Sequence, residues 1–175
     1  MTALVFVIFF GVLSGSILGA YCQLYYLIKN ITFSWESLLS HAIAKRQALH
    51  SLAVLGNYTT ERLSQEIEFL TQYHKVSWKV FLKHGYDILF AFSEMEESQG
   101  QLVHDILGAV EQRNEEIEII QSIEDFWASD NLFAFETAAY EQAVEKYLKQ
   151  RSRPALWLVA RIFRFLDLPD VRFCR

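Results

Sequence analysis

The chain begins MTALVFVIFFGVLSGSILGAYCQLYYLI (residues 1–28), without a single charged side chain, and Lys29 is the first charged residue. A helix of this length spans about 42 Å, whereas the hydrocarbon core of a bilayer is about 30 Å thick. The sequence therefore predicts that residues 1–28 form a transmembrane anchor, and that the lipid bilayer is one partner of the protein.

An uncleaved anchor fits these residues better than a secretory signal peptide does. A signal peptide has basic residues before a short apolar core and small residues at its cleavage site. Here no basic side chain precedes the apolar run, and Leu18 occupies the nearest position where a small residue would be needed. The basic residues Lys29, Lys45 and Arg46 all follow the apolar run, which predicts a single-pass protein with its N-terminus outside and its C-terminus in the cytoplasm.

Three glycines recur at four-residue spacing within the apolar run, at Gly11, Gly15 and Gly19. On a helix this spacing places them on one smooth face, which lets a second helix approach closely. The pattern predicts a helix-association face and self-association of the chain.

The remaining residues predict an all-α fold. The chain has only two prolines and seven glycines, and a seam of apolar and aromatic residues at alternating steps of four and three runs along the last long segment. That seam consists of Phe133, Thr137, Tyr140, Val144 and Tyr147. We expect the transmembrane helix to continue into an antiparallel, up-down four-helix bundle over residues 29–152. If Gly85 only kinks its helix instead of marking a turn, the alternative is a bundle of three longer helices.

Charge divides the chain into zones. Residues 59–145 carry five basic and eighteen acidic side chains, whereas residues 146–175 carry eight basic and two acidic ones. This polarity predicts a basic end near anionic lipid and an acidic middle that projects away from it. Nucleic acid is not expected as a partner, because no recognition motif accompanies the basic residues.

Residues 153–175 form a third region, a basic amphipathic tail. A helix that begins at Pro154 places Trp157, Arg161 and Arg164 on one side and mostly apolar residues on the rest. Arginine and tryptophan beside a wide apolar face are typical of a helix that lies in the membrane interface. The alternative is that this helix caps the core of the bundle.

No motif for catalysis, cofactor binding or metal binding occurs in the sequence. It contains neither the His-Glu-x-x-His zinc motif nor a glycine-rich phosphate loop, and no histidine follows a glutamate by three residues as di-iron bundles require. We therefore nominate no catalytic residue, cofactor or metal ligand, and we do not expect an enzyme.

Several residues also align with a known sequence pattern. Trp35 precedes a basic pair, a long final helix follows, and an apolar tail comes last. The residues in register are Ala134, Tyr140, Ala143, Val144 and Tyr147 on that helix, then Leu158, Val159 and Ala160 in the tail. This order resembles the LemA family of bacterial proteins, and the chain looks like a divergent member because Glu141 and Leu148 replace that family's asparagines.

The resemblance implies a helical bundle anchored in the bacterial cytoplasmic membrane, without an established enzymatic activity. Two alternative functions are consistent with these features. The first is a scaffold or interaction protein that binds an unidentified membrane or cytoplasmic protein. The second is a membrane-shaping or organelle-organising protein that acts on lipid through its anchor and its C-terminal amphipathic helix.

Overall fold

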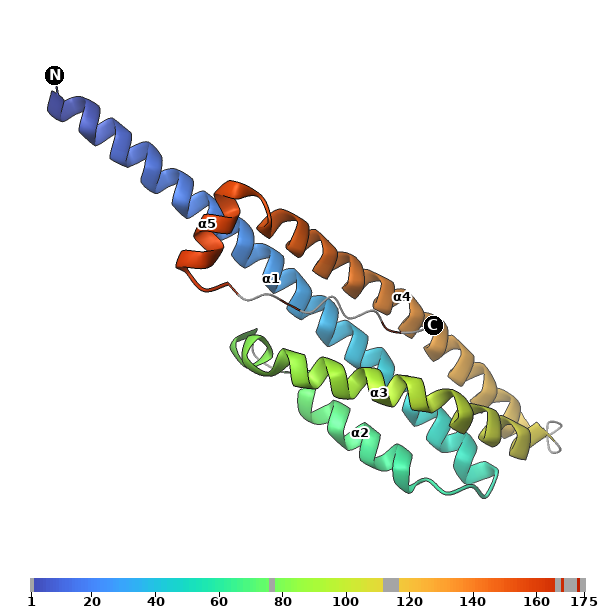
Figure 1. Cartoon of the computed structure of the whole chain (residues 1–175). Helices are drawn as coiled ribbons and strands as arrows, with labels where there is room; N and C mark the ends of the chain where they lie inside the picture. The colour runs from blue at the N-terminus through green and yellow to red at the C-terminus, as the bar shows by residue number, and fades with distance from the viewer. Residues whose placement is uncertain (1, 76–77, 112–116, 166–167, 169–172, 174–175) are drawn as a thin grey trace.

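The computed structural model describes the chain except for residues 1, 76–77, 112–116, 166–167, 169–172 and 174–175 (Figure 1). The described residues form five α-helices and no strand, which confirms the all-α class predicted from the sequence. The helices are α1 (Thr2–Leu55), α2 (Glu61–His74), α3 (Trp78–Glu111), α4 (Ile117–Arg151) and α5 (Pro154–Ile162).

Helix α1 has two parts with different surroundings. Its first part projects beyond the other helices (Figure 1), and its large apolar side chains from Leu4 to Leu13, and again Leu18, are exposed. From Leu24 onward, one face of the same helix is buried. The helix is long and apolar enough to cross a membrane. An 18-residue stretch of it has a mean hydropathy of 2.2, and none of that stretch is buried against the rest of the chain.

The end of α1 follows from its last residues. Asn57 adopts a left-handed conformation with φ 54°, its backbone N–H donates to the Val54 carbonyl, and the Tyr58 N–H donates to the Ala53 carbonyl. These two bonds define a Schellman motif, which satisfies carbonyls at the end of the helix that would otherwise lack partners. Gly56 and Asn57 therefore form the turn that ends α1 at Leu55.

The boundary between α2 and α3 lies earlier than the sequence suggests. Apolar residues at helical spacing continue to Val80, yet α2 ends at His74 and α3 begins at Trp78. Gly85, whose role as a turn or a kink the sequence leaves open, lies buried within continuous α3. Glycine inside a helix costs only about 1 kcal/mol relative to alanine, which the surrounding helix can absorb.

Helix α1 is the element on which the others pack. It contacts α2, α3, α4 and α5, and α4 lies beside it with the opposite chain direction (Figure 1). The Trp35 ring lies 5.6 Å from those of both Phe92 on α3 and Tyr140 on α4, between ring centroids. The predicted seam of α4 from Phe133 to Tyr147 is buried, as expected.

The buried apolar residues form two separate clusters. One contains α1 residues from Leu24 to Ala42 together with residues of α2 and α3, the seam of α4 and the buried side of α5. The other contains Leu49 to Ala53 together with residues of α2, α3 and the first part of α4. On α1, the residues between the two clusters include Lys45 and Arg46.

Two glycines give a test of this packing. A Cβ added to Gly108 in α3 would meet no atom within 4 Å, whereas one added to Gly56 would lie 2.9 Å from Val110 Cγ1. We expect Gly108→Ala to raise the free energy of unfolding by about 0.5–1 kcal/mol through helix propensity. Gly56→Ala should lower it, because the turn must move away from α3. Urea unfolding in detergent micelles measures both, and equal effects of the two changes would contradict the turn packing.

Candidate functional site

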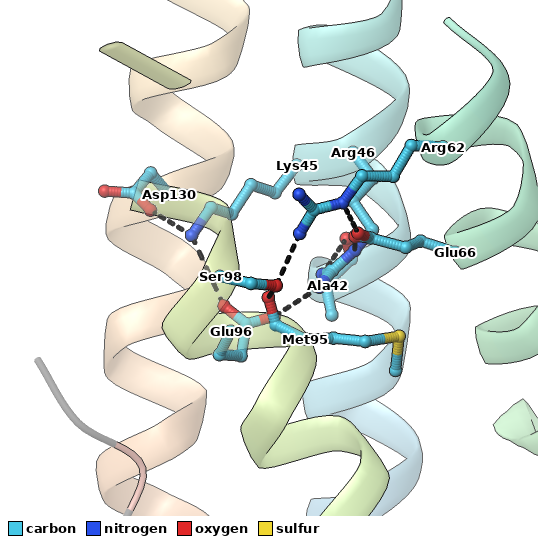
Figure 2. Close-up of polar contacts among 9 residues, drawn as sticks. All are labelled: Ala42, Lys45, Arg46, Arg62, Glu66, Met95, Glu96, Ser98 and Asp130. Carbon is cyan, nitrogen blue, oxygen red and sulfur yellow. Dashed lines mark hydrogen bonds and ion pairs between the residues drawn. The ribbon is translucent and has the colours of Figure 1, made fainter. Parts of the chain in front are cut away.

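The residues between the two apolar clusters form a layer of charged side chains contributed by four helices. Arg46 is 0% exposed, and Lys45 beside it is also buried. Because adjacent residues on a helix point about 100° apart, the two cations reach different neighbours. Figure 2 shows both side chains extending from α1 toward carboxylates on the surrounding helices.

Arg46 joins α1 to α2 and α3. Its Nε lies 2.8 Å from Glu66 Oε2 on α2, and its Nη2 lies 2.7 Å from Glu96 Oε1 on α3. A further bond of 3.4 Å runs from Nη1 to the Ala42 carbonyl within α1. One guanidinium therefore links both α2 and α3 to α1.

Lys45 joins α1 to α4. Its Nζ lies 2.8 Å from Asp130 Oδ1 and 3.6 Å from Glu96 Oε2, and it sits 4.7 Å from the centre of the Phe133 ring. Glu96 thus accepts contacts from both cations of α1. Arg62 completes the set, since its Nε lies 2.9 Å from Glu66 Oε1 and its Nη2 donates to Ser98 Oγ on α3 (Figure 2).

The six charged groups of this layer balance, three cations against three carboxylates. We call the set Lys45, Arg46, Arg62, Glu66, Glu96 and Asp130 the polar layer. Removing a charge from water costs several kcal/mol, and only close partners offset that cost. The layer therefore acts as one unit, in which the loss of a buried member removes part of the charge compensation from each of its partners.

A cavity of about 420 Å³ adjoins the polar layer between α3 and α4. Lys45, Glu96 and Asp130 form its charged wall, and aromatic side chains form much of the remainder. Gln99 of α3 also lines it, and this residue is only 2% exposed. No group of His, Cys, Asp and Glu among the described residues is arranged to hold a metal ion.

The predicted helix-association residues lie on the projecting part of α1. A Cβ added to Gly11, Gly15 or Gly19 would meet nothing within 4 Å, so this face is open. In α5, the Arg161 guanidinium lies 5.4 Å from the centre of the Trp157 ring, and Trp157 is exposed. Arg164 lies beyond the end of α5, in a left-handed conformation with φ 54°.

Most residues of the family pattern lie in the core. Trp35 and Tyr140 pack together, and Ala143, Val144 and Tyr147 follow on the same buried side of α4. In α5, Val159 and Ala160 are buried, whereas Leu158 is exposed. Ala134 is exposed and lines the cavity.

Lys29, Lys45 and Arg46, the basic residues that predict the orientation, differ in their surroundings. Lys29 is exposed, whereas the other two are buried and paired with carboxylates. No motif in the sequence identifies Glu66, Glu96, Asp130 or Gln99. Their signal is position: Glu66 lies three residues after buried Leu63 and four before buried Leu70, where an apolar residue is expected.

Comparison of the chain with known protein families, curated proteins and solved structures finds no match.

The polar layer predicts a large effect at Arg46. Arg46→Met removes the cation and leaves two buried carboxylates, so we expect the free energy of unfolding to fall by about 3–5 kcal/mol. Lys29→Met removes an exposed cation from the same helix and should change it by less than about 0.5 kcal/mol. Urea unfolding of both variants in detergent micelles makes the comparison. Similar stabilities would contradict the proposed role of the layer.

Tyr147 predicts a pH dependence. Its burial raises the pKa of the phenol to about 12 from the usual 10.0, with nearby Arg151 acting in the opposite direction. Between pH 10 and 12 the folded chain therefore keeps the phenol proton of Tyr147, whereas the unfolded chain loses it. The contribution of Tyr147 to the free energy of unfolding is constant below pH 10 and falls between pH 10 and 12. We expect unfolding free energies to decline less steeply over pH 10–11.5 in Tyr147→Phe than in the wild type. The same decline of the unfolding free energy with pH in both proteins would contradict a raised pKa at Tyr147.

Proposed function

We propose that this chain is a membrane-anchored, non-enzymatic scaffold of the LemA type, which presents a helical domain to a protein partner at a bilayer surface. The observation that carries the proposal is the continuity of α1, which is an exposed apolar rod at one end and the packing centre of the domain at the other. Any partner bound to the domain would be held at the membrane by the same helix.

The length of the projecting part supports a span that ends near Tyr21. The rings of Phe163 and Phe165, just after α5, lie 5.0 and 5.4 Å from the Tyr21 ring. About 20 residues precede that point, which gives a helix of about 30 Å, the thickness of the hydrocarbon core. The exposed apolar residues Leu158 and Ile162 of α5 would then lie in the membrane interface.

We further infer a location and topology for the domain. The latter part of α1 with α2, α3 and α4 would form an up-down four-helix bundle on the cytoplasmic side of a bacterial membrane. The exposed Lys29, close to the inferred membrane boundary, supports this orientation. The open glycine face at Gly11, Gly15 and Gly19 supports self-association within the bilayer.

The outer surface of α4 is the part of the domain that best fits a protein partner. Phe135 is 70% exposed, and Leu132 beside it is also exposed. Buried aromatic and aliphatic anchors carry much of the binding energy in protein interfaces. We therefore assign the partner surface to this face of α4.

The second candidate is a membrane-shaping role, and the exposed apolar side of α5 favours it. In that case the protein would act on lipid through α1 and α5, and the outer face of α4 would have no partner. The two candidates differ in what lies against Phe135.

Site-specific photocrosslinking distinguishes them. A benzophenone amino acid replaces Phe135 on α4, Phe163 after α5 or Phe9 in the anchor, one at a time, in full-length protein in cells. All three side chains are exposed, so each replacement should leave the fold intact. We expect Phe135 to yield an adduct with a defined protein, whereas Phe9 yields lipid adducts or a second copy of the chain.

Lipid adducts at Phe163 support its place at the interface. Lipid adducts at Phe163 without any protein adduct at Phe135 would contradict the scaffold and favour membrane shaping. Failure of a detergent-solubilised pull-down to enrich any protein over an anchor-only control, residues 1–28, would count against the scaffold as well.

A further inference from the structure

The cavity between α3 and α4 has an unusual polar group in its wall. Both polar atoms of the Gln99 side chain, Oε1 and Nε2, are buried and have no hydrogen-bond partner among the described residues. Buried polar groups in folded proteins are nearly always hydrogen-bonded, because leaving one unpaired costs about 1–3 kcal/mol. An unpaired donor and acceptor side by side therefore indicate a place where a ligand completes the bonding.

The neighbouring charges limit the charge of that ligand. Lys45 lies within ion-pair distance of both Asp130 and Glu96. An anion would have to compete with these carboxylates for Lys45, and a cation would have to compete with Lys45 for them. Because the polar layer is already balanced, the cavity favours a neutral molecule.

The remaining walls limit its shape and polarity. Phe126, Trp127 and Phe133 of α4 and Phe173 of the C-terminal segment supply aromatic surface. Phe173 is held in place by its backbone N–H, which donates to Glu141 Oε1 at 3.1 Å. The volume of about 420 Å³ falls within the range of about 300–1,000 Å³ that is usual for small-molecule sites.

We propose that this cavity binds a neutral aromatic molecule bearing a carboxamide or lactam edge, with Gln99 both donating to and accepting from that edge. The aromatic walls would enclose the ring, and the side-chain amide of Gln99 would select the polar edge. This inference is independent of the membrane anchor and of any protein partner.

Three naphthalene derivatives test the proposal on the full chain in lipid nanodiscs. They are 2-naphthamide, its anionic counterpart 2-naphthoate, and the apolar 2-methylnaphthalene, with empty nanodiscs correcting for partition into lipid. The ¹⁵N-labelled side-chain amide of Gln99 reports binding by NMR. We expect 2-naphthamide to cause a saturable shift of that resonance and to bind at least tenfold more tightly than 2-naphthoate.

Matched variants identify the group responsible. Gln99→Met keeps the length of the side chain but removes the amide. This change should weaken the binding of 2-naphthamide about tenfold and leave the binding of 2-methylnaphthalene unchanged. The control is Gln101→Met, since Gln101 is exposed on the same helix and its amide donates to Asp105. That variant should bind all three compounds as the wild type does. For variants without the Gln99 amide, binding is followed through the ligand signals.

A second variant keeps the proposal testable if Gln99→Met does not fold. Gly100 lines the cavity, and a Cβ there would meet nothing within 4 Å, so Gly100→Leu should fold and reduce the binding of every compound. Equal affinity of wild type and Gln99→Met for 2-naphthamide would overturn the assignment to Gln99. The absence of any saturable shift in the wild type, or tighter binding of 2-naphthoate, would overturn the proposed ligand class.

Discussion

The structure depends above all on the two ion pairs that the buried Arg46 side chain makes with carboxylates of neighbouring helices. Through Glu66 and Glu96, one side chain of α1 holds both α2 and α3 in place. An apolar core tolerates sliding of one helix along another, because one aliphatic contact can replace the next. A buried guanidinium has no such freedom, since its carboxylate partners must stay within hydrogen-bond distance. The polar layer therefore sets the register of the helices, and the apolar clusters on either side supply most of the burial.

Much of the fold can be predicted from sequence because it depends on local patterns. The uncharged run at the N-terminus and the spacing from Phe133 to Tyr147 can each be recognised within one segment. In the structure, residues 2–28 lie in α1 and residues 133–147 lie in α4. The polar layer cannot be read in this way. Glu66, Glu96 and Asp130 lie at least thirty residues apart, and a buried glutamate has the same letter as an exposed one. They differ from exposed acidic residues only in their position on the buried face of each helix. Which face is buried becomes known only once it is known which helices pack together.

The helix ends show a second limit. The end of α1 was predictable because Gly56 and Asn57 favour a Schellman motif. A related turn ends α5, where the Phe165 N–H donates to the Ala160 carbonyl and Arg164 takes the left-handed conformation. Arginine does not favour the left-handed conformation, so the sequence contains no signal for a turn at Arg164. Helical spacing alone therefore predicted a helix that includes Arg164, whereas α5 ends at Ile162. Contacts of Phe163 and Phe165 with Tyr21, which no local pattern contains, accompany the turn.

The continuity of α1 connects the projecting, apolar end of the molecule with the polar layer. Residues 20–55 contain neither glycine nor proline, the residues at which helices most often bend. A rotation of the projecting part about its own axis would therefore turn Lys45 and Arg46 by the same angle. Both side chains are held by carboxylates on other helices, so that rotation would break ion pairs or carry α2, α3 and α4 along. The cavity shares Lys45, Glu96 and Asp130 with the layer, so a ligand held there would favour one rotational position of α1 over others.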